Sequence, residues 1–457
     1  MNLKILLKLT VVGGFCYFLS SCNKNTDLPA FSDSDLELQN LLAEASGGKG
    51  FEYYILPDET DFQKIPQDLK NPLTVEKVEL GKLLFHETGL GQNPIISSSV
   101  QTYSCASCHH AKAGFQACVP QGIGEGGIGY GIQGEKRIVD ILYKTAQIDV
   151  QPIRTPSALN IAYQSNILWN GQFGGKDLNI GTESNWTKGT PKAVNELGYS
   201  GVETQAIAGR DVHRLLIDRI FMSHFSTYKS MYEKAFGAES FNNPKLLALN
   251  GALAIAAYER TLLANRSPFQ QWLRGNANAM TDQEKEGAKV FFSKGNCYSC
   301  HNGPSLANME FHALGMNDLK NGSYGANTVQ NISDANPEHK GRGGFTGRQE
   351  DLYRFKVPQL YNLKDSPFYG HGASFTNIKE VLDYKNKGVP QNVKVPANKI
   401  SDKFKPLNLS DDEILALEAF IKNGLYDHDL ERYAPKSLPS GLAFPNNDKQ
   451  SRLDLGF

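Results

Sequence analysis

The chain has 457 residues and carries 47 Lys and Arg against 48 Asp and Glu, which gives a formal net charge of −1. This length is enough for two or three domains. With 40% hydrophobic and 21% charged residues, the composition is that of an ordinary globular protein. The near-neutral charge argues against a nucleic-acid partner, because binding to nucleic acid relies on an excess of basic residues.

The first 22 residues have the pattern of an export signal. Lys4 and Lys8 precede an apolar stretch over residues 9–19, which is too short to cross a bilayer comfortably. Residues 19–22 (LSSC) resemble the cleavage box of bacterial lipoproteins, in which the cysteine, here Cys22, becomes the lipidated first residue. An ordinary secretory signal with an incidental cysteine is the alternative. Both interpretations place the mature protein outside the cytoplasm, and we expect it in the periplasm or cell envelope, anchored to a membrane through Cys22.

The segment after the signal predicts a tether. Residues 23–50 are polar and end in the sequence SGGKG, which is typical of a flexible connection between a lipid anchor and a folded body. The body is expected to begin near residue 51. Its first predicted element is an amphipathic helix over residues 74–85, with Thr74 as the N-cap.

The chain contains two Cys-x-x-Cys-His motifs, one formed by Cys105, Cys108 and His109 and the other by Cys297, Cys300 and His301. This motif is typical of covalent c-type haem attachment, in which two thiols add to the vinyl groups of one haem and the histidine ligates its iron. Chance, a zinc site or a disulfide would each explain one copy, but two copies together disfavour them. We therefore predict two covalently bound haem c groups, and with them redox chemistry.

The region after the first motif is rich in glycine. Seven glycines lie within residues 122–134 and include a formal Gly-x-Gly-x-x-Gly pattern. No strand precedes this pattern and no βαβ unit surrounds it, so it favours a flexible loop near the first haem over a nucleotide site. Further along, the sequence over residues 244–264 is rich in Ala and Leu and predicts a long helix.

Two capping boxes mark helices in the last third of the chain. Thr281 with Glu284 predicts the start of a helix that leads into the second motif. Ser410 with Glu413 predicts the start of a closing amphipathic helix that includes residues 414–421.

Few alternating strand patterns occur, so the predicted fold class is mainly α, with long connecting loops. Because one motif lies in each half, we expect two cytochrome c-like helical domains, each with a covalently attached haem. Residues 274–278 (RGNAN) indicate a linker. The expected units are an N-terminal domain over residues 51–274, a C-terminal domain over residues 275–435 and a tail over residues 436–457.

The motifs, together with several shorter words in the same order, resemble the bacterial di-haem cytochrome c peroxidase family, which includes the MauG-like enzymes. The matching words are residues 80–85 (LGKLLF), 154–160 (RTPSALN), 168–171 (LWNG), 259–262 (ERTL) and 367–372 (PFYGHG). The resemblance implies two cytochrome c-like domains whose haems face their interface. It also implies reduction of hydrogen peroxide to water at the N-terminal haem. The electrons would come from a small c-type cytochrome or copper protein and enter through the C-terminal haem.

A peroxidase needs an acid–base group over its reactive iron, and the resemblance assigns this role to Glu203. In many family members a histidine in an Ile-Gly-His-Gly loop blocks the resting N-terminal haem. Residues 128–131 match that loop but carry Tyr130 in place of the histidine. We therefore predict a five-coordinate N-terminal haem that is active without prior reduction.

The sixth ligand of the C-terminal haem is less sharply defined. The peroxidases carry a methionine there, which raises the potential, but the matching helix over residues 378–386 has none. Related MauG-like enzymes use a tyrosine in this region, which makes Tyr384 the first candidate. Lys385, Met309 and Met316 are the alternatives.

The resemblance further implies that Trp169 lies between the haems, where an aromatic ring can relay an electron. It implies a calcium ion between the domains, held partly by an asparagine, but Arg154 occupies the matched position and counts against the calcium. Family members are often dimers, so a homodimer stays open.

Two other functions compete with the peroxidase. A MauG-like oxidase would modify a protein or a small molecule, and the missing methionine and the Tyr130 loop favour it somewhat. A non-enzymatic electron carrier would hold two six-coordinate haems, and Glu203 argues against that.

Overall fold

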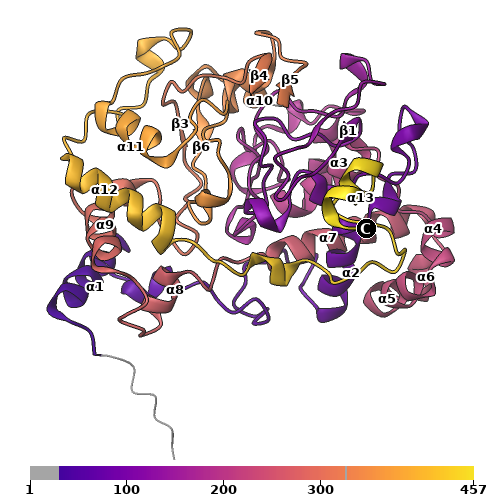
Figure 1. The fold of residues 1–457 in the computed structure, drawn as a ribbon, viewed down its shortest axis with the longest axis horizontal. Helices are drawn as coiled ribbons and strands as arrows, with labels where there is room; N and C mark the ends of the chain where they lie inside the picture. Colours follow the sequence, from indigo (N-terminus) through magenta and orange to yellow (C-terminus); the bar gives the residue numbers. More distant parts are fainter. Residues whose placement is uncertain (1–29, 325–326) are drawn as a thin grey trace, which may run out of the picture.

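The computed structural model describes residues 30–324 and 327–457, so the predicted export signal and Cys22 lie outside the described residues. The fold is helix-rich, as predicted (Figure 1). The helices are α1 (Asp33–Ala45), α2 (Val75–His86), α3 (Gly201–Val212), α4 (Arg219–His224), α5 (Ser226–Phe236), α6 (Ala238–Phe241), α7 (Pro244–Arg260), α8 (Pro268–Leu273), α9 (Asp282–Phe292), α10 (Arg342–Thr346), α11 (Ile378–Lys387), α12 (Asp411–Ala419) and α13 (Lys449–Leu455). Among the described helices, none is long and apolar enough to cross a membrane.

Strands are few and short. The described strands form three antiparallel pairs: β1 (Gly127–Ile128) with β2 (Ile138–Val139), β3 (Phe311–His312) with β6 (Phe355–Lys356), and β4 (Gly322–Tyr324) with β5 (Asn327–Val329). The glycine-rich residues 122–134 lie beside the first motif, where a Cβ on Gly122 would be 3.0 Å from the Sγ of Cys108, and they form a loop apart from the short strand β1.

The helix starts predicted from local sequence are confirmed. Thr74 caps α2, the Thr281 box opens α9 and the Ser410 box opens α12. The end of α7 differs, since the helix stops at Arg260 rather than near residue 264. The reason is tertiary: the side chain of Asn160 accepts from the Ala264 N–H at 3.0 Å and draws the chain out of the helix.

The helices gather in two groups, each around one close crossing. In the first group α2 and α3 pack against α7, and α5 packs against α2. In the second group α1 and α12 pack against α9, and α11 packs against α12. In the first group a Cβ on Gly81 of α2 would lie 1.9 Å from the carbonyl oxygen of Ala254 in α7. In the second, a Cβ on Gly287 of α9 would lie 1.9 Å from the carbonyl oxygen of Ala416 in α12. Glycine is therefore required at both crossings, because any side chain would push the paired helices apart.

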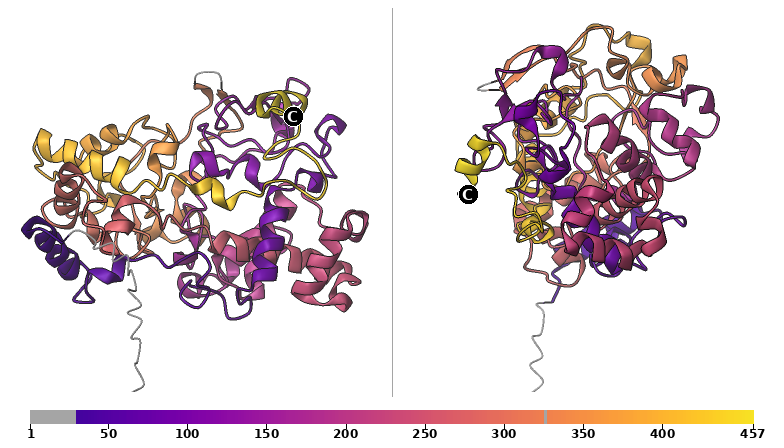
Figure 2. Two further views of the ribbon diagram at one scale, coloured as in Figure 1. Left: turned by 60° about the horizontal axis from the view of Figure 1, so that its bottom comes forward. Right: turned by 90° about the vertical axis from the view of Figure 1, so that its right-hand side faces the viewer.

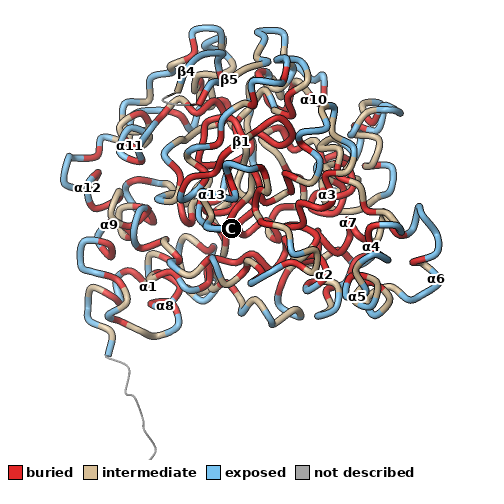
Figure 3. The backbone as a smooth tube through the Cα atoms, turned by 45° about the vertical axis from the view of Figure 1, so that its right-hand side comes forward, coloured by how far each residue is buried: buried red, intermediate tan, exposed pale blue. Residues whose placement is uncertain are grey.

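Each end of the chain packs with the helix group that is formed mainly by the opposite half of the sequence. The N-terminal α1 packs against α9, while the segment after α12 crosses to the first group and ends beside α2 and β1 (Figures 1 and 2). Figure 3 shows that buried backbone runs through the middle of the molecule and exposed backbone lies in the outer loops. Each end of the chain therefore completes the half that lies farther from it in sequence.

The tether predicted over residues 23–50 is wrong for residues 33–45, which form α1. Ser32 starts the helix through a capping box with Asp35, and Leu38 and Leu42 are fully buried. The Asp35 carboxylate lies 2.7 Å from the Nζ of Lys285 in α9. The polar composition of the segment concealed a short apolar stripe that gains stability only by docking on another helix.

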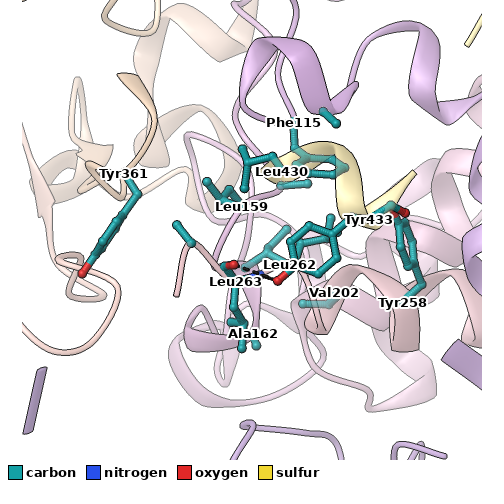
Figure 4. Close-up of a cluster of buried hydrophobic side chains, with 14 of the residues drawn as sticks. Phe115, Leu159, Ala162, Val202, Tyr258, Leu262, Leu263, Tyr361, Leu430 and Tyr433 are labelled. Atoms are coloured by element: carbon teal, nitrogen blue, oxygen red, sulfur yellow. Dashed lines mark hydrogen bonds between the residues drawn. The ribbon is translucent and has the colours of Figure 1, made fainter. Parts of the chain in front are cut away.

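The returning segment contributes to the core of the first group. Tyr433 and Leu430 are buried in the same cluster as Phe115 and Leu263 (Figure 4). The hydroxyl of Tyr433 donates to the Leu263 carbonyl at 2.8 Å and accepts from the Leu263 N–H at 3.1 Å. Further on, the Pro445 carbonyl accepts a hydrogen bond from Ser104, directly before the first motif, at 3.0 Å.

Candidate functional site

A single cavity of about 460 Å³ connects the two Cys-x-x-Cys-His motifs. His109 borders it at one end, and Cys297, Cys300 and His301 border it at the other. The cavity lies between the two groups of helices, with walls from both. The structure therefore brings the two predicted motifs to one site.

The two motif histidines have matching surroundings. The Nδ1 of His109 lies 3.1 Å from the carbonyl oxygen of Phe115, and the Nδ1 of His301 lies 3.1 Å from that of Leu306. A carbonyl oxygen only accepts, so each Nδ1 carries the proton and each Nε2 keeps a free lone pair. Burial lowers the pKa of both rings to about 4. Each histidine is thus neutral and able to bind a haem iron through Nε2.

The remaining donors near the motifs fit haem better than zinc. Cys300, Glu310 and His312 bring donor atoms within 4.8 Å of one another, which is the single cluster of three such donors among residues 30–324 and 327–457. The first motif belongs to no such cluster in the described chain, so zinc does not explain both copies. Lys356 also lines the cavity, with its Nζ on the side-chain oxygen of Gln164, and burial lowers its pKa to about 7. A basic group in this position suits the carboxylates of a haem.

Glu203 lies in α3 but does not line the cavity. Both of its carboxylate oxygens accept from the Arg260 guanidinium, at 2.8 Å from Nε and 2.6 Å from Nη2. The side chains of Glu203 and Arg260 are 0% and 3% exposed. Two residues further along α3, Gln205 faces the cavity instead. A carboxylate held in this way is a structural partner for Arg260 and has no open path to a substrate.

Glu259, next to Arg260 in α7, is the carboxyl group that lines the cavity. Its Oε2 is buried without a hydrogen-bond partner among the described residues, and in its ionised form it would raise the pKa of the Cys105 thiol in the first motif. Burial, helped by the negative charge of Glu203, raises the pKa of Glu259 to about 8. Glu259 therefore carries a proton at neutral pH. The sequence motif ERTL contained this residue, but nothing in the motif showed which way its side chain points.

A histidine–carboxylate pair lies near the first motif as well. The Nδ1 of His213, at the C-terminal cap of α3, is 2.8 Å from the Oδ2 of Asp149. Burial disfavours the charged ring, but the Asp149 carboxylate outweighs it and raises the pKa of His213. The charge of His213 in turn acts on His109. No sequence motif marks this pair, because its members lie 64 residues apart in the chain.

Trp169 borders the cavity that joins the motifs, and its role as an electron relay stays a prediction. Its indole N–H donates to the carbonyl oxygen of Arg154 at 2.8 Å. The ring meets that of His371 edge-on, with centroids 6.3 Å apart, and His371 stacks on Phe355 at 3.6 Å. The orientation of the indole is therefore fixed by residues from both halves of the chain.

The loop that contains Tyr130 is held by the C-terminal helix. The N–H groups of Tyr130 and Gly131 donate to the Asp454 carboxylate of α13 at 2.9 and 2.8 Å, and the Gly129 N–H donates to Asp448 at 3.0 Å. The Tyr130 hydroxyl lies 3.3 Å from the Nδ1 of His110, and the tyrosine is 2% exposed. Tyr130 therefore packs beside the attachment turn and does not line the cavity.

Arg154 occupies the place predicted for a calcium ligand. Its Nε donates to the Phe368 carbonyl at 2.9 Å, and its Nη2 donates to Gln116 at 2.8 Å and to Ser366 at 2.5 Å. A guanidinium that already supplies positive charge to these oxygens repels a divalent cation. The side chains at this position therefore do not fit calcium, and Arg154 itself links the two halves.

The predicted ligand Tyr384 does not line the cavity; it packs between the aromatic rings of a separate buried cluster. Its hydroxyl donates to the Leu314 carbonyl at 2.5 Å, and its ring lies 5.1 Å from that of Phe375 and 5.0 Å from that of Phe404. The neighbouring Lys385 lines the cavity. Met316 also lines it, whereas Met309 does not.

The comparisons with known proteins agree with these motifs. Residues 75–278 match the family model described as di-haem cytochrome c peroxidase. The chain is 26% identical over 368 residues to the methylamine utilization protein MauG of Methylorubrum extorquens, which covers 79% of this chain and 81% of that protein. It is 28% identical over 369 residues to the cytochrome c peroxidase Ccp of Escherichia coli, which covers 78% of this chain and 65% of that protein.

A solved structure has a similar fold. A MauG-like protein associated with microbial copper homeostasis aligns with a TM-score of 0.55 at 20% identity, covering 83% of this chain and 97% of that chain. The sequence motifs and the family match therefore agree: residues 75–278 match the di-haem cytochrome c peroxidase family model, and the similar proteins include both cytochrome c peroxidases and MauG.

Proposed function

We propose that this protein is a di-haem peroxidase that reduces hydrogen peroxide to two waters, using two electrons and two protons for each turnover. The observation that carries the proposal is the single cavity that joins His109 and His301 with Trp169 on its wall. Two motifs on one cavity suit a two-centre redox reaction, in which electrons enter at one centre and are used at the other.

Each haem would be held by one motif. Cys105 and Cys108 would attach the first haem with His109 as the iron ligand; Cys297, Cys300 and His301 would hold the second in the same way. These two groups supply the redox chemistry of peroxide reduction when they are bound. The two groups of helices would then act as two cytochrome c-like domains, with a boundary near residue 275.

Glu259 takes the acid–base role that the sequence assigned to Glu203. Its carboxyl group holds a proton at neutral pH because burial raises its pKa to about 8, and the group faces the cavity near Cys105. From there it donates that proton to the departing oxygen of peroxide and recovers it from the next peroxide. Glu203 keeps the Arg260 charge compensated behind it.

The fixed loop around Tyr130 supports activity without prior reduction. Because Asp454 and Asp448 hold the loop and Tyr130 packs beside His110, no side chain from this loop lines the cavity among the described residues. We therefore expect the peroxide site at the first haem to be open in the resting protein.

The setting and partners follow from the export signal and the family. We propose a periplasmic protein anchored to a membrane through lipidated Cys22. It would receive electrons from a small c-type cytochrome or copper protein. A homodimer stays open, and an intrinsic calcium ion is not part of the proposal, given the guanidinium of Arg154.

A MauG-like oxidase is the second candidate. The observation that favours it is the absence of a methionine on α11, because a methionine ligand would raise the potential of the electron-receiving haem. Such an enzyme would use the same cavity to withdraw electrons from a protein or small molecule through Trp169. A simple electron carrier is the third, and it would hold two six-coordinate haems.

Stopped-flow oxidation of a reduced small c-type cytochrome by hydrogen peroxide tests the proposal, with the haem-loaded protein in its fully ferric form. Fast turnover is expected without pre-reduction. An absence of turnover even after half-reduction would overturn the peroxidase assignment in favour of the oxidase or the carrier.

A further inference from the structure

One face of α11 forms part of the wall around the second motif. Ile378, Val381, Leu382 and Lys385 line the cavity together with His301. Their spacing of i, i+3, i+4 and i+7 is that of a single helix face. Tyr384, one position away from Lys385, points to a different side of the helix and into an aromatic pocket.

Lys385 is the polar member of this otherwise apolar face. Its charge acts on Cys297, Cys300 and His301, so its amine lies close to the second motif. None of the described residues gives its Nζ a hydrogen bond or a carboxylate partner, and the Phe404 ring lies 5.8 Å from it. Lys379, on the same helix, differs from Lys385: it is exposed, and its Nζ lies 2.9 Å from the Asp383 carboxylate.

Lys385 is half-buried and faces a mostly apolar cavity, where an amine without a partner is costly and is commonly paired or bound to a metal. The partner of Lys385 must therefore come from whatever fills the cavity. A haem offers two possible partners for this side chain. The iron would bind a neutral amine, and a propionate would pair with a charged ammonium. Because Lys385 shares the cavity wall with His301 and acts on both motif cysteines, the iron is the nearer choice.

The other predicted ligands fit less well. The Tyr384 hydroxyl is already donated to the Leu314 carbonyl. Met316 reaches the cavity, but its Sδ packs over Gly370, 3.2 Å from where a Cβ on that residue would lie. A thioether in van der Waals contact with the backbone needs no further partner, whereas an unpaired amine does.

We propose that the Lys385 amine is the sixth ligand of the iron held by His301. This inference rests on the haem attachment proposed above. An Nζ–Fe bond forms and the ammonium proton leaves to solvent, with no change in the oxidation state of the iron. A nitrogen ligand in place of methionine sulfur keeps the potential of this haem low, which suits a centre that gives up its electron readily to the first haem.

The test uses the full chain, matured with haem, in four variants. Lys385→Ala removes the amine, and Lys385→Met offers a thioether at the same point. Lys379→Ala is the matched control, an exposed lysine on the same helix. Met316→Leu tests the competing sulfur. Haem content for each chain is measured first, followed by low-temperature electron paramagnetic resonance of the ferric protein and a redox titration of each haem.

We expect two haems per chain in all variants and a low-spin signal from the second haem in the wild type. Lys385→Ala should convert that signal to high-spin. Lys385→Met should keep it low-spin, add a sulfur-to-iron charge-transfer band and raise the potential. Lys379→Ala and Met316→Leu should match the wild type.

Three outcomes would overturn the inference. Loss of the low-spin signal in Met316→Leu but not in Lys385→Ala would assign the sulfur. An unchanged spin state in Lys385→Ala with a small shift in potential would assign a propionate contact. Fewer than two haems in the wild type would remove the attachment on which the inference rests. Because none of these readouts is peroxide turnover, they separate this inference from the proposed activity.

Discussion

Replacing Glu203 with glutamine should lower the free energy of unfolding without abolishing peroxide turnover. The substitution keeps the size of the side chain but removes the charge that faces the Arg260 guanidinium at 2.6 Å, in a pair whose members are 0% and 3% exposed. Breaking a fully buried pair by neutralising one partner costs about 3–5 kcal/mol, because the other charge stays buried without compensation. Arg260 keeps one hydrogen bond to the Pro66 carbonyl, which does not replace the lost charge.

Urea unfolding of the haem-loaded protein at pH 7, followed by circular dichroism, measures this loss. Asp383→Asn is the matched control: it breaks the exposed pair with Lys379 and should move the midpoint much less. The double variant Glu203→Leu with Arg260→Met should regain most of the stability, since an apolar pair can replace a buried ion pair. The reasoning would be refuted if Glu203→Gln kept wild-type stability yet lost about 100-fold or more of its turnover, the range typical of a catalytic acid–base group.

Four further predictions concern the cavity and its surroundings. Glu259→Gln should lower peroxide turnover by about 10²–10⁴-fold with both haems retained. A larger loss of turnover in His213→Gln would assign the acid–base role to His213 instead. Wild-type turnover should fall as pH rises through about 8, where Glu259 loses its proton, and a flat profile from pH 6 to 9 would contradict this. Dialysis against a calcium chelator should leave turnover unchanged because Arg154 fills the ion's place, and recovery on adding calcium back would disprove it. Trp169→Phe should slow the transfer of an electron between the haems in stopped-flow records while leaving both haem spectra intact; an unchanged rate would rule out the relay.

Local signals in the sequence predicted much of this fold because they act over a few residues. Thr281 with Glu284 caps α9 and Ser410 with Glu413 caps α12, since a capping box is complete within one helical turn. The two attachment motifs were equally local. The stripe of Leu38 and Leu42 in α1 was missed because a short helix is stable only through what it docks on.

Which side chains of a helix face the cavity cannot be seen in the sequence. Glu203 and Gln205 lie in one helix, and only the fold decides that the first faces Arg260 and the second the cavity. The same holds for Tyr384 and Lys385, since neighbouring residues of a helix point about 100° apart. At about a quarter identity, an alignment to the family identifies the matching helix but can be shifted by one residue. A shift of one residue here replaces Tyr384, which is buried, with Lys385, which lines the cavity.

The exchanged ends of the chain constrain the order in which the protein can be built. The core around Phe115 and Leu263 stays incomplete until Tyr433 arrives, and the loop at Tyr130 is not held until Asp454 has been added. Neither half can therefore reach its final state as a separate early unit, and folding must wait for contacts of long sequence separation, which slow it.

The late closure bears on access to the first motif. Cys105 and Cys108 are partly exposed in the finished structure, and we expect both thiols to be more accessible before the closing segment docks. The closing segment covers this turn, because the hydroxyl of Ser104, directly before the first motif, donates to the Pro445 carbonyl. Without residues 436–457 the turn at Ser104 would lack this partner, and the first motif would be open to solvent on that side, so a segment far away in sequence protects the attachment turn.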